Sequence, residues 1–486
     1  MKSVIRLLAV ALLLHLALGC SGTPVKAGIV TAYAAPKDLP VHLRAEEFAV
    51  TAGGKPIDLY NGGLNSWNNP VIFGSFDMTG GPVEVTILPR DSFNTYTLLP
   101  RSLELKSKQE EKAITFTLEE AANVTLVLDD DFQGTVLHLF AQKEESDIPD
   151  PSDSKVVYFG PGYHDLGGYG GKPVMLESGQ TLYIAGGAVV RGRVRASNVS
   201  DITIRGRGIL YNDYTTNDEH GNVTLALSYV TNSKVQDIIV NNDTANWTSA
   251  LHGSSFVEVL NYKGVSPRFA SSDGFDINSS HDIIFDGTFI HSADDAVAIK
   301  GLSEEKEAAK ALPIYNITYQ NAQLWSDANN AIGIGAETVA AYFKNITFRN
   351  IDVLYNFDDR NNPDVLPDRS AINIFSLNAT HFSDITFEDI RVEKAKRLIN
   401  IQMDTTFYFG ALLGSWVEDG SMSNITYSNI TSYSDGTNEI KVAGWDEKHL
   451  ISDVIFKNIN INGKKLINID DPHFTINKYT ANINVQ

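Results

Sequence analysis

The sequence has a single cysteine, Cys20, so no disulfide can form within the chain. It also lacks the basic excess that marks nucleic-acid-binding proteins: 39 lysines and arginines stand against 59 aspartates and glutamates, a formal net charge of −20. Beyond the first twenty residues, no apolar run is long enough to span a membrane. With 43% hydrophobic and 20% charged residues, the composition is that of a folded globular protein, which excludes a disordered, collagenous or coiled-coil chain.

The first twenty residues have the pattern of an export signal. Lys2 and Arg6 precede an apolar stretch over residues 7–18, which is short for a membrane span. The stretch LALGC ends on Cys20 and resembles a bacterial lipoprotein signal, in which the cysteine receives the lipid. We therefore expect residues 1–20 to be a lipoprotein-like signal peptide. The protein would then be exported to the bacterial periplasm, the outer-membrane surface or the extracellular medium. The alternative is that Cys20 is discarded with the signal.

Residues 28–150 predict a separate β-sandwich domain. Short runs of alternating apolar and polar residues, separated by clusters of Gly, Pro, Asn and Asp, are typical of half-buried strands joined by turns. The polar stretch SDIPDPSDS is expected to link this domain to the rest of the chain. The clearest runs cover residues 82–88, 113–118, 123–129 and 135–141.

From residue 155 onward one motif recurs in eight units. Each unit has a polar residue followed by Asp or Asn, then a strand of apolar and aromatic residues, and then another Asn, Asp or Gly. Repeats that each hold short strands and turn residues indicate a solenoid, and we predict a parallel β-helix over residues 155–486. The units begin at Ser200, Gln236, His281, Tyr315, Lys344, Ser383, Ser423 and Ser452.

The recurring Asp and Asn residues are assigned to the turns of this solenoid. Asp201, Asp282, Asp384 and Asp453 occupy the same place at the start of their units. Asn tolerates the left-handed backbone conformation and can stack into hydrogen-bonded ladders. This explains the many N-x-S/T sequences without glycosylation.

A different group of aspartates interrupts the repeat between Ser271 and Gly301. Asp273 and Asp294 are 21 residues apart, which is about one coil of such a solenoid. Asp273 and the Asp294–Asp295 pair should therefore lie side by side on neighbouring strands. Like charges this close repel one another and raise at least one carboxyl pKa. A protonated acid beside an ionised base is the arrangement that inverting glycosidases require.

Other uses of these carboxylates stay open. Asp276 lies in the same segment and is interpreted as structural rather than catalytic. A turn-capping role is the alternative for the other three aspartates, and a calcium site is a second use of clustered carboxylates. A β-helix polysaccharide lyase would combine calcium with a basic residue that abstracts a proton. Our prediction has no cofactor and no bound metal.

Four further residues are candidates for contacts with a sugar. Trp247 lies one coil before Asp273, where it could stack on a sugar ring or be a core aromatic. His252 could donate a hydrogen bond to a hydroxyl group or be merely structural. Asn330 could do the same, or belong to an Asn ladder. Lys300 follows the double aspartate, where its charge could contact the substrate or lower a neighbouring pKa.

At these residues the sequence resembles the polygalacturonase family of glycoside hydrolases and its relative, the dextranase–isopullulanase family. The polygalacturonase pattern is N-T-D, D-D, G-H-G and R-I-K. Here SSD (271–273) and ADDAVAIKG (293–301) match the first two motifs. In NNAIGIGAE (329–337), Asn330 stands where the family has His, and RSAINI (369–374) is the nearest candidate for the last motif. The N-terminal strands look more like the dextranase family, which has a β-sandwich before its helix.

The resemblance implies an all-β protein whose N-terminal β-sandwich is followed by a right-handed parallel β-helix, and which hydrolyses glycosidic bonds with inversion. By the same resemblance, Asp294 is the general acid, and Asp273 and Asp295 position and deprotonate the attacking water. We expect a monomer that binds a polysaccharide or oligosaccharide and no nucleic acid. It would meet a membrane only through a lipid on Cys20.

The identity of the sugar depends on the missing motifs. Without the His and the Arg–Lys pair, a neutral, dextran-like α-glucan suits the acidic chain. A galacturonan or a sulfated galactan is the alternative if Lys300, Arg369 and Arg397 converge. Two hypotheses compete with hydrolysis: a β-helix polysaccharide lyase, and a non-catalytic carbohydrate-binding surface protein.

Overall fold

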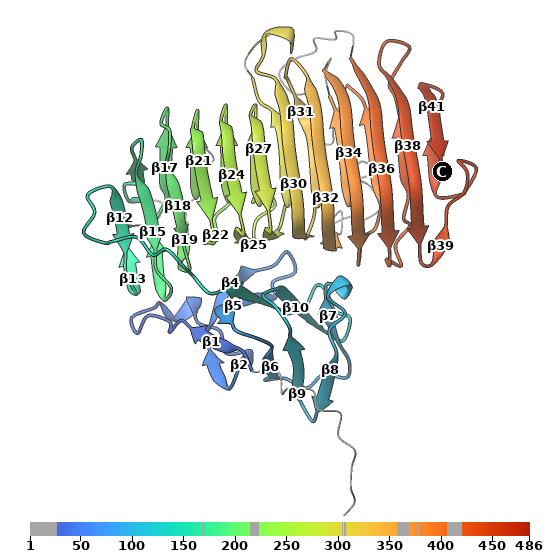
Figure 1. Ribbon diagram of the computed structural model, residues 1–486. Coiled ribbons are helices and arrows are strands. Elements are labelled where there is room, and N and C mark those ends of the chain that lie inside the picture. Colours follow the sequence, from blue (N-terminus) through green and yellow to red (C-terminus); the bar gives the residue numbers. More distant parts are fainter. Residues whose placement is uncertain are drawn as a thin grey trace, which may run out of the picture.

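The computed structural model describes residues 27–167, 170–213, 223–303, 305, 308–356, 369–377, 380–405 and 420–486. Two small sheets come first along the chain, and a long stack of coils follows them (Figure 1). Cys20 and the predicted signal peptide lie outside the described residues. In the part of the chain that the structure describes, no helix is long and apolar enough to cross a membrane.

The N-terminal domain is a β-sandwich in which a six-stranded and a five-stranded sheet share one apolar core. The four strands predicted in this region correspond to β6, β9, β10 and β11, with ends shifted by at most two residues. The six-stranded sheet consists of β1 (Ile29–Ala32), β4 (Leu59–Leu64), β5 (Pro70–Thr79), β7 (Tyr96–Leu99), β10 (Asn123–Leu128) and β11 (Val136–Lys143). The five-stranded sheet consists of β2 (Phe48–Ala52), β3 (Lys55–Ile57), β6 (Val83–Pro89), β8 (Ser107–Glu110) and β9 (Ala113–Leu118). Two short 3-10 helices, η1 (Val41–Leu43) and η2 (Arg101–Leu103), connect strands of this domain.

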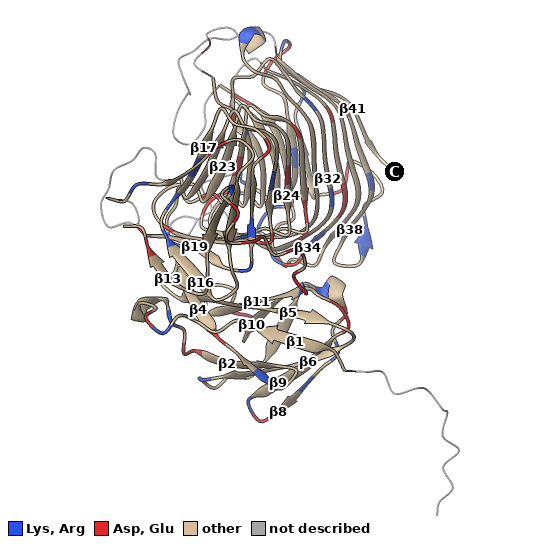
Figure 2. Ribbon diagram, turned by 60° about the vertical axis from the view of Figure 1, so that its left-hand side comes forward, with Lys and Arg blue, Asp and Glu red and all other residues tan. Residues whose placement is uncertain are grey.

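The second domain is a right-handed parallel β-helix, in which each coil adds strands to two long sheets. An eleven-stranded sheet, which includes β17 and β23, lies on the side away from the sandwich (Figure 2). Its strands are β14 (Val174–Leu176), β17 (Val194–Ser197), β20 (Leu225–Ser228), β23 (Ser249–His252), β26 (Phe275–Asn278), β29 (Val297–Gly301), β31 (Ile332–Thr338), β33 (Ile372–Ser376), β35 (Ile399–Met403), β37 (Ile440–Ala443) and β40 (Phe474–Ile476).

The other sheet has nineteen strands and wraps around the rest of each coil. A 3-10 helix, η4 (Ala308–Lys310), lies in the connection between β29 and β30. The strands are β12 (Val156–Phe159), β13 (Gly162–Asp165), β15 (Thr181–Ile184), β16 (Ala188–Arg191), β18 (Thr203–Gly206), β19 (Ile209–Asp213), β21 (Thr231–Gln236), β22 (Ile239–Asp243), β24 (Ser255–Leu260), β25 (Lys263–Ser266), β27 (His281–Asp286), β28 (Phe289–Ser292), β30 (Ile314–Ser326), β32 (Phe343–Asn356), β34 (His381–Val392), β36 (Ser421–Ser432), β38 (Leu450–Ile461), β39 (Lys464–Lys465) and β41 (Thr480–Val485).

The predicted ladders of Asp and Asn hold the bends of the coils. Asp201, Asp282, Asp384 and Asp453 all have φ between +54° and +60°. Amide groups join neighbouring coils at these positions. The Nδ2 of Asn316, for example, donates to Oδ1 of Asp282 over 2.9 Å. Short polar side chains relieve the left-handed backbone and satisfy each other, so the repeat is explained structurally.

Inside the coils, apolar side chains stack one coil above the next. A column of aromatic rings continues through six coils, with centroids 4.7 to 5.5 Å apart. The aromatic column consists of Phe285, Tyr319, Phe348, Phe387, Tyr427 and Phe456.

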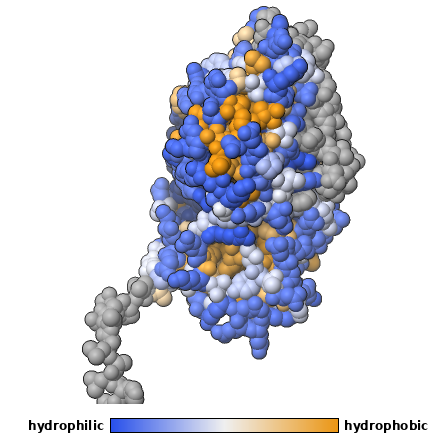
Figure 3. Space-filling view, turned by 90° about the vertical axis from the view of Figure 1, so that its right-hand side faces the viewer, coloured by the Kyte–Doolittle hydropathy of each residue, from blue (hydrophilic) through white to orange (hydrophobic). Residues whose placement is uncertain are grey.

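Apolar residues gather at the C-terminal end of the stack (Figure 3), where Ile467 is 74% exposed and Ile469 is 41% exposed.

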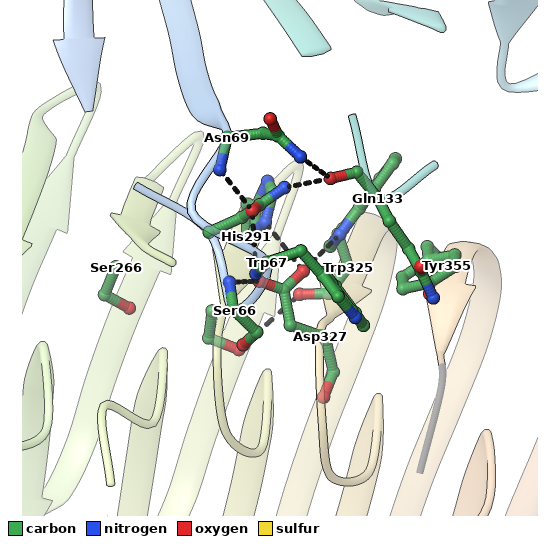
Figure 4. A network of polar contacts seen from close by, with 12 residues as sticks. Ser66, Trp67, Asn69, Gln133, Ser266, His291, Trp325, Asp327 and Tyr355 are labelled. Atoms are coloured by element: carbon green, nitrogen blue, oxygen red, sulfur yellow. Dashed lines mark hydrogen bonds and ion pairs between the residues drawn. The ribbon is translucent and has the colours of Figure 1, made fainter. Parts of the chain in front are cut away.

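The sandwich is joined to the β-helix by a buried polar network (Figure 4). His138 of the sandwich shares a hydrogen bond of 2.9 Å with His291 of the helix, and both side chains are fully buried. The other ring nitrogen of His291 lies 3.2 Å from Oδ1 of Asp327, whose Oδ2 accepts the backbone N–H of Ser66. Burial and the neighbouring His291 hold the pKa of His138 well below its usual value, so its ring is neutral.

Two buried cations of the β-helix also take their partners from the sandwich. Arg207 donates to Asp77 over 2.9 Å, and both side chains are less than 5% exposed. Lys263 donates to Oε1 of Gln142 over 2.7 Å, and its burial lowers its pKa to about 7. Arg207 also pairs with Asp237 of the β-helix over 3.0 Å, so the sandwich supplies part of what neutralises and solvates these two buried charges.

Candidate active site

The predicted aspartates lie where four strands of the eleven-stranded sheet begin. The register of β23, β26, β29 and β31 places Trp247, Asp273, Asp295 and Asn330 in successive coils. Backbone hydrogen bonds confirm this order: Thr248 N–H donates to the carbonyl of Asp273, Gly274 N–H to that of Asp295, and Ala296 N–H to that of Asn330. The side-by-side arrangement expected from the 21-residue spacing is present.

Lys300 lies inside this cluster. Its Nζ is 2.7 Å from Oδ2 of Asp273 and 3.0 Å from Oδ1 of Asp276, and the residue is only 5% exposed. The ammonium also lies 4.6 Å from the centre of the Trp247 ring. Of its two predicted roles, this position favours lowering the pKa of its neighbours over contact with the substrate. Asp276, interpreted from the sequence as structural, is fully buried and shares this lysine.

Asp294 differs from the other aspartates of the cluster because its side chain is partly exposed. Its Oδ1 accepts hydrogen bonds from the backbone N–H of Asp295 and from Nδ2 of Asn329. Its carbonyl accepts the hydroxyls of Ser292 and Ser326, which fixes the backbone. Desolvation raises the pKa of Asp294, and the hydrogen bond from Asn329 opposes that rise.

Asp295 is held by the residue expected to bind substrate. The backbone N–H and Nδ2 of Asn330 both donate to Oδ1 of Asp295 over 2.9 Å, and Oδ1 of Asn330 accepts the N–H of Ser370. Asn330 is 4% exposed, so its amide positions the carboxylate instead of facing a ligand. Gly333 leaves room for it: a Cβ there would lie 3.1 Å from Oδ2 of Asp295.

The cluster holds more carboxylates than its lysine can neutralise. Burial raises the pKa of Asp273 well above its usual value, and the charge of Asp276 adds to the effect. Burial raises the pKa of Asp276 to about 7. Burial, together with the charge of Asp294, also raises that of Asp295 to about 7. Although burial opposes it, the surrounding carboxylates raise the pKa of Lys300 well above its usual value. The site therefore keeps an ionised lysine and at least one protonated carboxyl near neutral pH.

The remaining candidates lie at different distances from this cluster. Trp247 is partly exposed, so one face of its ring can meet Lys300 while the ring keeps contact with solvent. His252 lies at the opposite end of β23, with its ring edge-to-face with Tyr229 at 5.4 Å. Both residues line a cavity of about 760 Å³. No contact joins His252 to the carboxylates within the part of the chain described.

Sequence reasoning missed one residue that shapes the site, Asn329, and the pairing of another, Asp276, which it had named as structural. Asn329 binds Asp294, and its only signal was its place beside Asn330 in the motif that departs from the family pattern. Asp276 was present in the same segment, but its pairing with Lys300 depends on side-chain direction. Among the residues that the structure describes, no group of three or more His, Cys, Asp or Glu is arranged to hold a metal ion.

The chain is similar to solved structures and matches one family model. Dex49A from Penicillium minioluteum is similar with a TM-score of 0.65 and 13% identity, over 93% of this chain and 96% of that one. The family 28 exopolygalacturonase of Yersinia enterocolitica gives a TM-score of 0.49 and 12% identity, over 94% and 96%. No curated protein sequence matches the chain. The family model for glycosyl hydrolases family 28 matches residues 185–480, more than half of the sequence. The chain therefore belongs to family 28 of the glycosyl hydrolases.

Proposed function

We propose that this glycoside hydrolase cleaves its polysaccharide with inversion, using Asp294 as the general acid and Asp273 with Asp295 as the general base. The observation that carries the proposal is the crowding of four carboxylates around Lys300 in adjacent coils. This crowding keeps one carboxyl protonated while another is ionised. Asp294 is the partly exposed member, so it can reach a glycosidic oxygen.

The chemistry follows from these positions. Asp294 gives its proton to the glycosidic oxygen as the bond to the anomeric carbon breaks. Asp273 and Asp295 take a proton from a water molecule, whose oxygen bonds to the anomeric carbon from the opposite face. The products are two shorter chains, one with a new reducing end. Lys300 donates to Asp273 over 2.7 Å and opposes the burial that raises the pKa of that carboxyl, and Asn330 holds Asp295 through two hydrogen bonds.

The cations near the site support a neutral substrate. Two carboxylates share Lys300, and Nε of Arg397 lies 3.6 Å from Oε2 of Glu439. Arg369 donates to the carbonyl of Ala328. All three cations are engaged by the protein itself, which does not favour recognition of a uronate or sulfate. A dextran-like α-glucan is therefore our first choice, and a galacturonan or galactan is second.

The competing hypotheses make different products. A lyase would release unsaturated ends that absorb ultraviolet light, and a binding protein would release none. Membership of family 28 supports hydrolysis over both.

We also propose that the protein is an exported bacterial lipoprotein, based on the signal-like residues 1–20 and on Cys20. In cells that process lipoproteins, the wild type should fractionate with membranes, and Cys20→Ser should appear in the soluble exported fraction. Equal partition of the two proteins would contradict lipid attachment.

The test of function is reducing-end release from dextran, pullulan, polygalacturonate and marine galactans. Asp294→Asn serves as the blank, and Asp453→Asn serves as a matched control in a ladder. We expect release by the wild type and by Asp453→Asn, but not by Asp294→Asn. Full activity in Asp294→Asn would reject Asp294 as the acid.

A further inference from the structure

One ladder of the β-helix carries an aromatic residue where its neighbours carry Asp or Asn. Phe256, at φ +55°, occupies in β24 the position held by Asn232, Asp282 and Asn316 in adjoining coils. The left-handed region is unfavourable for a bulky side chain. Phe256 also interrupts the ladder, because it has no amide to offer Asp282.

The exposure of Phe256 indicates a role outside the protein core. Its side chain is 58% exposed, so the strained backbone gains no core packing in return. Strained backbone conformations of this kind are typical of residues that contact a ligand. The ring of His281 lies edge-to-face with Phe256 at 6.2 Å, and Tyr315 stacks on His281 at 4.5 Å. Three consecutive coils therefore present a row of rings.

Phe256 lines a groove of about 700 Å³ that crosses six neighbouring coils. With coils about 4.8 Å apart, five spacings make the groove roughly 24 Å long, the length of several sugar rings. Ile284, which is 42% exposed, adds apolar surface beside Phe256. Hydroxyl and amide groups, such as those of Thr203, Asn232 and Thr318, complete the lining.

The charges of the groove select against an anionic ligand. Asp201, Glu258 and Asp282 all line it, and Lys234 is paired with Glu258 over 2.9 Å. A polyanion would meet carboxylates with little compensation. A neutral glycan offers apolar ring faces to Phe256 and hydroxyl groups to the amides.

We propose that this groove binds a neutral polysaccharide chain at a site separate from the catalytic cluster, an inference that rests on the proposed function. Asp273 and Asp282 belong to one coil, but β26 and a turn lie between them, so the two sites occupy different faces of the coil. Held there, a long chain would stay near the active site between cleavages.

The test uses dextran in affinity gel electrophoresis, in an Asp294→Asn background that prevents hydrolysis. Phe256→Asn restores the ladder residue and should fold, and Ile284→Gln is the second variant. We expect each to weaken retardation by dextran roughly three- to tenfold. Tyr433→Ala, which removes an aromatic that is 41% exposed and not part of the groove lining, should leave retardation unchanged.

Kinetics separate this inference from the proposed function. With active enzyme, Phe256→Asn should raise KM for dextran several-fold and leave kcat/KM for a short isomalto-oligosaccharide unchanged. Unchanged retardation in both folded variants would overturn the groove site even if dextran is hydrolysed. Failure of the wild type to cleave any tested polysaccharide would overturn the function, while retardation that depends on Phe256 would still support the groove.

Discussion

Aspartates at two places in the β-helix have their pKa values shifted in opposite directions. In the ladders, Asp282 accepts an amide from Asn316, and this hydrogen bond lowers its pKa. In the cluster, burial raises the pKa of Asp295 to about 7. The two residues belong to neighbouring stretches of the sequence and to the same repeat. Each accepts an amide from the next coil, so what separates them is their surroundings: Asp282 is partly exposed, whereas Asp295 is buried beside further carboxylates.

The largest effect should come from exchanging the proposed acid. Asp294→Asn removes the carboxyl that we propose as the proton donor, and we expect kcat to fall about 10²- to 10⁴-fold. Asp453→Asn makes the same chemical change in a ladder, at a position outside the groove, and should leave kcat within twofold. Steady-state rates of both purified variants, compared after confirming equal folding by circular dichroism, test the contrast. Equal losses in the two variants would mean that the cluster has no special role.

Lys300→Met should affect both stability and pH dependence. Removing one partner of a buried ion pair costs about 3–5 kcal/mol. The remaining carboxyls lose the charge that lowers their pKa, so the acidic limb of the kcat/KM profile should move to higher pH. Urea unfolding and a pH–rate profile measure the two effects. Lys300→Arg keeps the charge, and a profile as displaced as that of Lys300→Met would contradict the electrostatic role.

The two environments should also give opposite pH dependence of stability. The folded pKa of Asp276, about 7, lies above its ordinary value of 3.8. Its contribution is therefore fully present below pH 3.8 and is lost as pH rises through about 7. The pKa of Asp282 is lowered, so its contribution is present above pH 3.8 and is lost as pH falls through the folded pKa.

Denaturation between pH 3 and pH 8 tests this difference. Asp276→Asn should flatten the loss of stability between pH 4 and pH 7, whereas Asp282→Asn should flatten the loss below pH 4. If both variants changed the same limb of the stability curve, the contrast between ladder and cluster would be wrong.

Asn330→Ala removes one of the two hydrogen bonds that Asn330 donates to the carboxylate of Asp295. The backbone N–H remains as a donor, so only the Nδ2 contact is lost outright. A hydrogen bond to a charged group is worth about 1.5–3 kcal/mol, and the pKa of Asp295 should rise. We expect a greater loss of kcat/KM at pH 5.5 than at pH 8. A uniform loss at both values would assign Asn330 a purely structural part.

The smallest effect belongs to a ladder residue far from the cluster. Asn458, at φ +54°, donates to Asn429 over 2.9 Å. Asn458→Ala should cost about 2 kcal/mol through the left-handed backbone and the lost hydrogen bond. Activity at 25 °C should not change. Asn458→Gly keeps the backbone freedom and should cost less, and chemical denaturation of the two variants would distinguish strain from bonding.

The sequence was sufficient for features that repeat with the coil. The spacing of Asp273 and Asp294 predicted their adjacency because the coil between them is short and regular. The recurrence of Asp201 and Asp282 predicted the ladders for the same reason. The pairing of Lys300 with Asp276 was not predictable, since it depends on how an outward-facing side chain turns back across the sheet. The role of Asn330 was hidden as well, because the coil between it and Asp295 is 35 residues long.

The buried network between the sandwich and the β-helix has a consequence for any attempt to trim this enzyme. The family match begins at residue 185, yet His291, Arg207 and Lys263 inside that region find partners in the first 143 residues. A gene cut at the family boundary would encode a β-helix whose apolar interface residues, such as Val265, Phe289 and Trp325, face water. The part of the chain that can fold when moved to another protein is therefore larger than the part that the family model matches. Calorimetry should show the two domains unfolding in a single transition.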